Sequence, residues 1–185
     1  QSATYSNDAD NAGDEGRNSR AGFRLDWQTN QQNMITLQGG AYSIEYSDRV
    51  KSLTVSPPFS NVKKLETDLR GAHLLSRWNG RASNLQLYWD LSERESHFLT
   101  ERRITLDLDF DHTLSQHGKH QLGWGANYRY ITDDLPAGDI SKGEAVFFFP
   151  EERSDHLYSL FLQDEITLQP NHWWLTLGTK LEHND

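Results

Sequence analysis

The stretch ITLDLDFD, residues 104–111, alternates an apolar side chain with a hydroxyl or acidic side chain through four repeats. Successive side chains of an extended strand point to opposite faces, so this stretch predicts a strand with one apolar and one polar face. An α-helix repeats every 3.6 residues and would mix both kinds of side chain on each face. The pattern therefore predicts a half-exposed β-sheet.

The same two-residue period recurs along most of the chain. Further segments keep it at 23–28, 35–46, 85–90, 122–130, 156–168 and 173–183, and less regularly at 68–78. Short polar turns at 29–33, 79–83, 115–119 and 169–172 alternate with longer polar connections at 47–67, 92–102 and 132–154. We therefore predict an all-β, antiparallel up-and-down meander of about eight strands, each of roughly 9 to 13 residues. Strands of this length can cross a bilayer.

Composition narrows the class of protein. The chain has 35% hydrophobic and 11% aromatic residues, no Cys and a net charge of -9. The negative charge disfavours nucleic acid as a partner, and the absence of Cys rules out a disulfide framework. No run approaches the ~18 consecutive apolar residues of a spanning helix, whereas a transmembrane barrel needs an apolar residue only at every second position of a strand.

Connection lengths and aromatic positions predict an orientation in a membrane. Bacterial outer-membrane barrels have short periplasmic turns and long extracellular loops. With the short turns on the periplasmic side, one expected aromatic belt comprises Trp27, Trp78, Trp173 and Trp174, and the other comprises Tyr42, Tyr46, Trp89, Tyr128, Tyr130 and Tyr158. Aromatic pairs across the strands of a soluble sandwich are the alternative explanation of these residues.

The chain divides into two expected regions. Residues 1–17 are polar and acidic, with little to bury, and are expected to be a flexible remnant of an extracellular loop. Residues 18–185 are expected to form four hairpins of a transmembrane β-barrel wall. Both ends then lie on the extracellular side, which indicates a fragment of a larger barrel. A complete small barrel of ~8 strands is the alternative.

Several segments, in this order, resemble the barrel of TonB-dependent outer-membrane receptors over residues 22–185. They are ITLQGGAY (35–42), RW (77–78), LQLYWD (85–90), TLDLDFDH (105–112), LGWGANYRY (122–130), FLQDEITL (161–168) and LTLGTKLEHND (175–185). The most specific pair is FLQDEITL followed by LGTKLEHN.

The resemblance implies a barrel of about 22 strands around a plug, in the bacterial outer membrane. Such a receptor would import a scarce nutrient, with a ferric siderophore or other iron complex as the leading expectation and haem or cobalamin as other classes. The plug and the TonB box would lie N-terminal to this chain. The implied partners are therefore outer-membrane lipid, a small-molecule ligand such as a ferric chelate, and the TonB complex only through that N-terminal part.

Candidate site residues fall into two groups. The polar positions of three strands are expected to face the lumen: Thr105, Asp107, Asp109, Asp111, Asn127, Arg129, Gln163 and Glu165. Residues in the long connections are expected to contact ligand: Tyr46, Arg49, Lys51, Lys63, Lys64, Phe147, Phe148 and Phe149. Loops that are merely solvated are the alternative for the second group.

Metal binding by these side chains is not expected. Strand residues two apart are ~6.5 to 7 Å apart, so Asp107, Asp109 and Asp111 are expected to pair with bases such as Arg129 and not to close on one cation. Asp107→Asn is expected to cost little, whereas Leu106→Arg or Leu108→Arg is expected to be costly in a bilayer. His112, His117 and His120 are expected to be solvated imidazoles at a turn.

Two other classes of protein remain as alternatives. A soluble lipocalin-like barrel or β-sandwich that binds a ligand would bury the apolar face in its own interior. An outer-membrane enzyme would need a catalytic group, but Asp164 and Glu165 are consecutive and point to opposite faces of a strand. We expect neither enzymatic activity nor a cofactor.

Overall fold

The computed structural model describes residues 16–53, 55, 60–96, 99–136 and 148–185. The described chain forms eight strands: β1 (Gly16–Asn30), β2 (Asn33–Leu53), β3 (Ser60–Asn79), β4 (Ser83–Ser96), β5 (Thr100–Thr113), β6 (His120–Asp134), β7 (Glu152–Gln169) and β8 (Trp173–Asn184). Strand β1 begins within the segment expected to be a loop, whose residues 1–15 lie outside the described residues.

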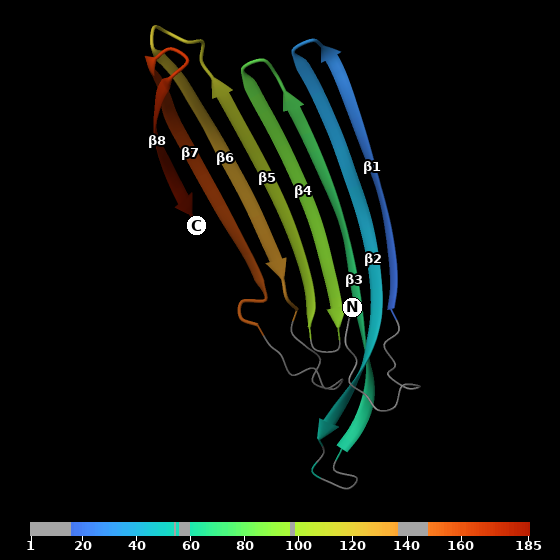
Figure 1. The fold of residues 1–185 in the computed structure, drawn as a ribbon. Helices are drawn as coiled ribbons and strands as arrows, with labels where there is room; N and C mark the ends of the chain where they lie inside the picture. Colours follow the sequence, from blue (N-terminus) through green and yellow to red (C-terminus); the bar gives the residue numbers. More distant parts are fainter. Residues whose placement is uncertain (1–15, 54, 56–59, 97–98, 137–147) are drawn as a thin grey trace.

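All eight strands form one antiparallel sheet in the order β1 to β8 (Figure 1), which confirms the predicted meander. Each strand pairs with its neighbours in sequence, and within the described residues β1 and β8 each pair on one side only. The sheet is therefore open, and the alternative of a small closed barrel is wrong for this structure.

The expected long connection at 47–67 is wrong, because most of it is strand. Strands β2 and β3 continue past Tyr46↔Thr67 to Leu53↔Ser60, and their ribbon projects beyond the other strands at the lower end of Figure 1. The sequence of this segment shows no regular alternation of apolar and polar residues, so no strand was predicted there. The ladder hydrogen bonds join backbone groups, so two strands can pair without such an alternation.

The expected connection at 92–102 is also wrong in extent. Strand β4 continues to Ser96, and β5 begins at Thr100. The backbone N–H of Ser96 donates to the Leu99 carbonyl at 2.9 Å, and the Ser96 hydroxyl donates to the same oxygen at 2.9 Å. The connection between β6 and β7 remains long, and most of it lies outside the described residues. Individual strands contain 12 to 21 residues, and all but β8 are longer than the predicted length.

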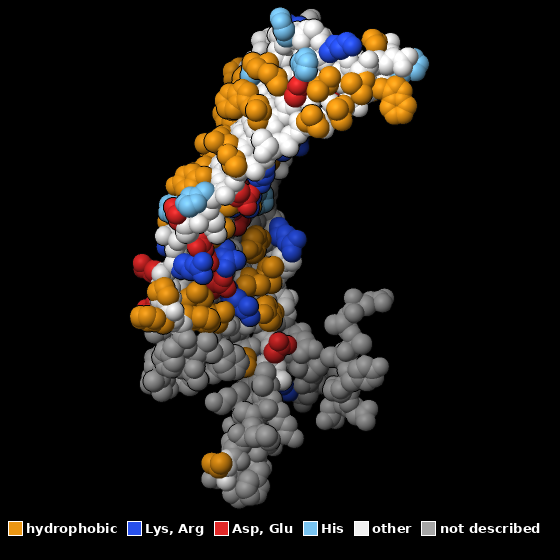
Figure 2. Space-filling model, turned by 90° about the vertical axis from the view of Figure 1, so that its left-hand side faces the viewer, with side chains coloured by type: hydrophobic (Ala, Val, Ile, Leu, Met, Phe, Trp, Pro, Cys, Tyr) orange, Lys and Arg blue, Asp and Glu red, His pale blue; other side chains and the backbone are white. Residues whose placement is uncertain are grey.

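The sheet is a single layer without a buried apolar core. No hydrophobic side chain among the described residues is buried, and many large ones are exposed. The register places these on one face: Phe23, Leu25, Trp27, Leu74, Leu87, Leu108, Leu160, Leu162 and Leu177. In Figure 2, hydrophobic side chains gather towards the short turns and charged ones gather below them. No helix in the described ranges is long and apolar enough to cross a membrane.

The aromatic residues follow the apolar face only in part. Tyr128, Tyr158 and His156 lie together on that face, with 5.0 Å between the two tyrosine ring centroids and 3.0 Å between Tyr128 Oη and His156 Nδ1. Tyr42 and Tyr46 instead share the polar face with Gln38. Register also pairs Trp174 with Thr167 on the polar face. These three residues are therefore wrongly assigned to the aromatic belts.

Candidate ligand-facing surface

The second face of the sheet carries the alternating polar side chains of the central strands. Asp109 pairs with Gln86 of β4 and with Asn127 of β6, and partners in an antiparallel ladder point to the same face. The register extends this face across the sheet, so that all eight residues expected to face the lumen lie on it: Thr105, Asp107, Asp109, Asp111, Asn127, Arg129, Gln163 and Glu165.

Asp107 is the best-buried acid of this face, with 7% of its surface exposed. Its Oδ2 accepts from Arg129 Nε at 2.6 Å, and its Oδ1 accepts from Asn127 Nδ2 at 3.3 Å. Asn127 Nδ2 also lies 3.3 Å from Asp109 Oδ2. Asp111 accepts from Asn84 Nδ2 at 2.8 Å. The three acids therefore bond to side chains of neighbouring strands.

Two histidines that lie on the apolar face, towards the short turns, also have separate partners. His112 Nδ1 lies 2.6 Å from Ser83 Oγ, and His120 Nδ1 lies 2.6 Å from Asp164 Oδ2. Within the described ranges, no three His, Cys, Asp or Glu residues are placed to hold a metal ion.

Loss of the Arg129 partner should destabilise the sheet. We expect Arg129→Gln to cost about 1 to 2 kcal/mol, because it removes a charge-assisted hydrogen bond from a carboxylate that is largely desolvated. Because Asp107 bonds to Arg129 and Asn127, we expect Asp107→Asn to reduce stability by more than the small amount expected from the sequence. Denaturant unfolding of the full-length protein in detergent measures both. The variant that carries both Arg129→Gln and Asp107→Asn should lose less stability than the sum of the two single losses. A loss equal to that sum would show that Asp107 and Arg129 are not energetically coupled.

Two hollows, one on the polar face and one on the opposite face where β2 and β3 extend beyond the other strands, carry charges of both signs. One, of about 570 Å³, is lined by Arg103, Arg129, Asp107, Asp133 and Asp155 among others, and Arg103 Nε lies 2.5 Å from Asp133 Oδ1. The other, of about 320 Å³, lies between β1, β2 and β3 and includes Tyr46, Lys64, Glu45, Glu66 and Asp68. Charges in both are balanced by neighbouring charges of opposite sign.

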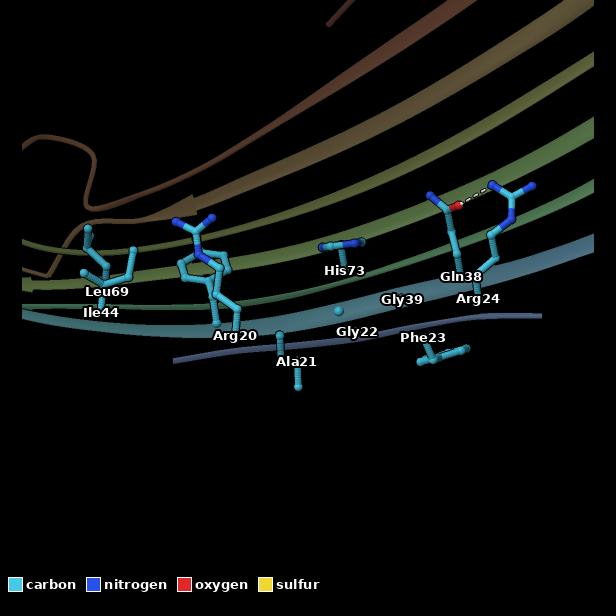
Figure 3. Close-up of a pocket in the computed structure, with 13 residues that line it drawn as sticks. Arg20, Ala21, Gly22, Phe23, Arg24, Gln38, Gly39, Ile44, Leu69 and His73 are labelled. Atoms are coloured by element: carbon cyan, nitrogen blue, oxygen red, sulfur yellow. Dashed lines mark hydrogen bonds between the residues drawn. The ribbon is translucent and has the colours of Figure 1, made fainter. Parts of the chain in front are cut away.

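A third hollow, of about 950 Å³, lies between β1, β2 and β3 further towards the short turns. Figure 3 shows Arg20, His73, Gln38 and Arg24 on the side of the sheet opposite to Ala21 and Phe23. Sequence reasoning missed this hollow. The sequence could have indicated it by the glycines that line it, Gly22, Gly39 and Gly40. However, only the register shows that Gly22 lies opposite Gly40.

The residues expected to contact ligand in the loops do not form one site. Tyr46 lines the 320 Å³ hollow, whereas Arg49 and Lys64 face one another across β2 and β3. Lys64 Nζ lies 3.7 Å from Glu66 Oε1, so its charge is shared with an acid. Phe148 and Phe149 are 39% and 101% exposed. Lys51 and Lys63 are described in their backbone only, and Phe147 lies outside the described residues.

An open antiparallel sheet with one exposed apolar face and one ion-paired face defines a class, the wall of a membrane β-barrel. The family model described as "TonB dependent receptor-like, beta-barrel" matches residues 1–185, and the chain belongs to that family. Membership excludes the lipocalin-like alternative and agrees with the expectation of a receptor and not an enzyme.

Among solved structures, the chain is similar to the crystal structure of the siderophore receptor PirA from Pseudomonas aeruginosa, with a TM-score of 0.57 and 17% sequence identity. The match covers 95% of this chain and 35% of that receptor, so the chain spans about a third of its length. At this identity the likeness shows the fold alone. No curated protein matches the chain.

Proposed function

We propose that this chain is the barrel-wall portion of an outer-membrane receptor that imports a scarce nutrient, with a ferric siderophore or other iron complex as the cargo. The TonB complex would supply the energy through a part of the receptor outside this chain. Family membership supports the transport class. PirA, which has a similar fold, is a siderophore receptor, and this favours iron among the possible cargoes.

One observation carries the proposal, namely the division of the sheet into two faces. The apolar face is exposed along its length, with Leu25, Leu160 and Leu177 more than half exposed at 59%, 57% and 56%. Water would make this exposure costly, at roughly 25 cal/mol per Å² of apolar surface, whereas lipid would cover it. The opposite face presents ion pairs and hollows to a lumen through which a polar solute can pass.

Uptake by cells of the source bacterium tests the transport proposal. Deletion of the receptor that contains this chain should abolish uptake of a radiolabelled ferric chelate, and deletion of TonB should abolish the same uptake, because both lie on one route. Iron starvation should raise the amount of receptor in the outer membrane. Unchanged uptake of every ferric chelate tested, in cells that produce the receptor when starved of iron, would exclude an iron cargo.

A further inference from the structure

The two boundaries of the apolar face differ in charge. At the long-loop end, acids outnumber bases in the two rows of residues next to the apolar side chains: Glu45, Asp68, Glu93, Glu95, Asp134 and Glu152 with Arg17, Arg70 and Arg102. At the short-turn end, Asp164 is the single acid of the described apolar face between Trp124 and the turns. This end is therefore poor in acids, although the chain has a net charge of -9.

The short turns themselves carry bases and no acid. The turns after β1, β3, β5 and β7 comprise residues 31–32, 80–82, 114–119 and 170–172. None of them contains Asp or Glu, and their basic residues are all exposed: Arg81, His117, Lys119 and His172. Within the described residues, no carboxylate lies within ion-pair distance of Arg81 or Lys119. The charges of these two side chains are therefore available to a partner.

His120 adds an imidazole on the apolar face beside these turns. His117 and His120 are bridge partners, so their side chains share one face. His120 Nδ1 lies 2.6 Å from Asp164 Oδ2, so the one acid of this region is bonded within it. Asp164 offsets one positive charge at most, and Arg81 and Lys119 together exceed it. Asp111 and Glu165 lie on the polar face, so the sheet separates them from the apolar face.

Tryptophan side chains mark the membrane surface at the same end. Trp27, Trp124 and Trp173 lie on the apolar face near the short turns and are 61%, 40% and 67% exposed. Tryptophan rings concentrate at the level of the lipid headgroups. Figure 2 shows His side chains among hydrophobic ones at this end of the molecule. The basic turns therefore lie at the depth of the phosphate groups of the lipid.

We propose that the short turns bind the headgroups of anionic phospholipids in the periplasmic leaflet. Lys119 and Arg81 supply the charge, and His117 and His120 supply further polar contacts. A basic segment next to a membrane-spanning element attracts anionic lipid, and each Lys or Arg near the surface contributes about fivefold in affinity. The inference rests on the proposed function for the side of the membrane, since the short turns of an outer-membrane barrel face the periplasm.

Quenching by brominated lipids in the reconstituted full-length protein tests this inference. One sample carries a bimane fluorophore on a cysteine in place of Leu122, which follows His120 by two residues on the apolar face. A second sample carries it in place of Leu25, on the same face of β1. The vesicles are phosphatidylcholine with a minor fraction of brominated phosphatidylglycerol or brominated phosphatidylcholine, alike in both leaflets. We expect phosphatidylglycerol to quench more strongly than phosphatidylcholine at residue 122 and equally at residue 25.

Lys119→Gln should lower the preference for phosphatidylglycerol at residue 122 about fivefold. Lys180→Gln is the matched control and should leave the preference unchanged, because Lys180 lies on the polar face and its Nζ lies 2.5 Å from Glu182 Oε2. Quenching by brominated phosphatidylcholine at residue 25 checks that each variant inserts.

The inference is overturned if the two lipids quench equally at residue 122, if Lys119→Gln leaves the preference unchanged, or if Lys180→Gln lowers it as much. In each of these cases the apolar face still contacts lipid, and the proposed function stands. Absence of quenching by either lipid at both positions would contradict the proposed function as well.

Discussion

Replacing Leu108 by arginine is expected to destabilise the full-length receptor in a lipid bilayer by about 2 to 4 kcal/mol. Leu108 lies near the middle of β5, is 39% exposed, and is flanked on the apolar face by Leu87 and Tyr128. A guanidinium at this position would enter the hydrocarbon region without a partner. Reversible denaturant unfolding of the receptor from lipid vesicles measures the cost.

Asp109→Arg is the matched control for this variant. It introduces the same side chain one residue further along β5, but on the face that carries Gln86 and Asn127. We expect a cost below about 1 kcal/mol, because the new charge stays in a polar environment. A larger penalty for Asp109→Arg than for Leu108→Arg would reverse the assignment of the two faces.

Gly125→Val is the second substitution with a large expected effect. An ideal Cβ at Gly125 would lie 2.3 Å from Cε1 of the Phe161 ring and 2.6 Å from the backbone oxygen of Phe110. The ring can turn aside, but the β5 backbone can move only by distorting the ladder that holds Asp107 beside Arg129. We expect a loss of about 1 to 3 kcal/mol or more, measured by the same unfolding experiment.

Gly123→Ala separates this clash from a general cost of replacing strand glycine. Gly123 lies two residues before Gly125 on the same face, and its Cβ would meet Gln163 Cγ at an ordinary 3.4 Å. We expect this variant to be within about 0.5 kcal/mol of the unsubstituted receptor. Phe161→Ala should recover only part of the Gly125→Val cost, since the contact with the Phe110 oxygen remains. Equal costs at the two glycines would contradict the packing described here.

Much of the fold could be predicted because the alternation of side chains between the two faces of a strand is a local property. The alternation at 104–111 is visible in the sequence, and it places Asp107 and Leu108 on opposite faces before any partner strand is known. Strand ends were harder to predict. The sequences of residues 47–53 and 60–67 show no regular alternation of apolar and polar residues, and yet their backbones pair as a continuous ladder.

The candidate site could be predicted only in part. The alternation of side chains placed the eight polar residues of β5, β6 and β7 on one face. The same alternation places Tyr42 on the face of Gln38, which the assignment of Tyr42 to an aromatic belt overlooked. The 950 Å³ hollow depends on register between strands. A shift of β1 by one residue would remove Gly22 from its place opposite Gly40, and nothing within β1 alone specifies that register.

Nitroxide accessibility along residues 104–111 tests the central claim, that the apolar face contacts lipid and the polar face lines the lumen. The chain contains no Cys, so single cysteines for labelling can be placed at successive positions without competition from within it. In the receptor reconstituted in lipid vesicles, collision with oxygen should peak at 104, 106, 108 and 110, and collision with a water-soluble nickel chelate should peak at 105, 107, 109 and 111. The claim would be contradicted if oxygen and the nickel chelate collided most often at the same positions, or if the positions of their peaks were exchanged.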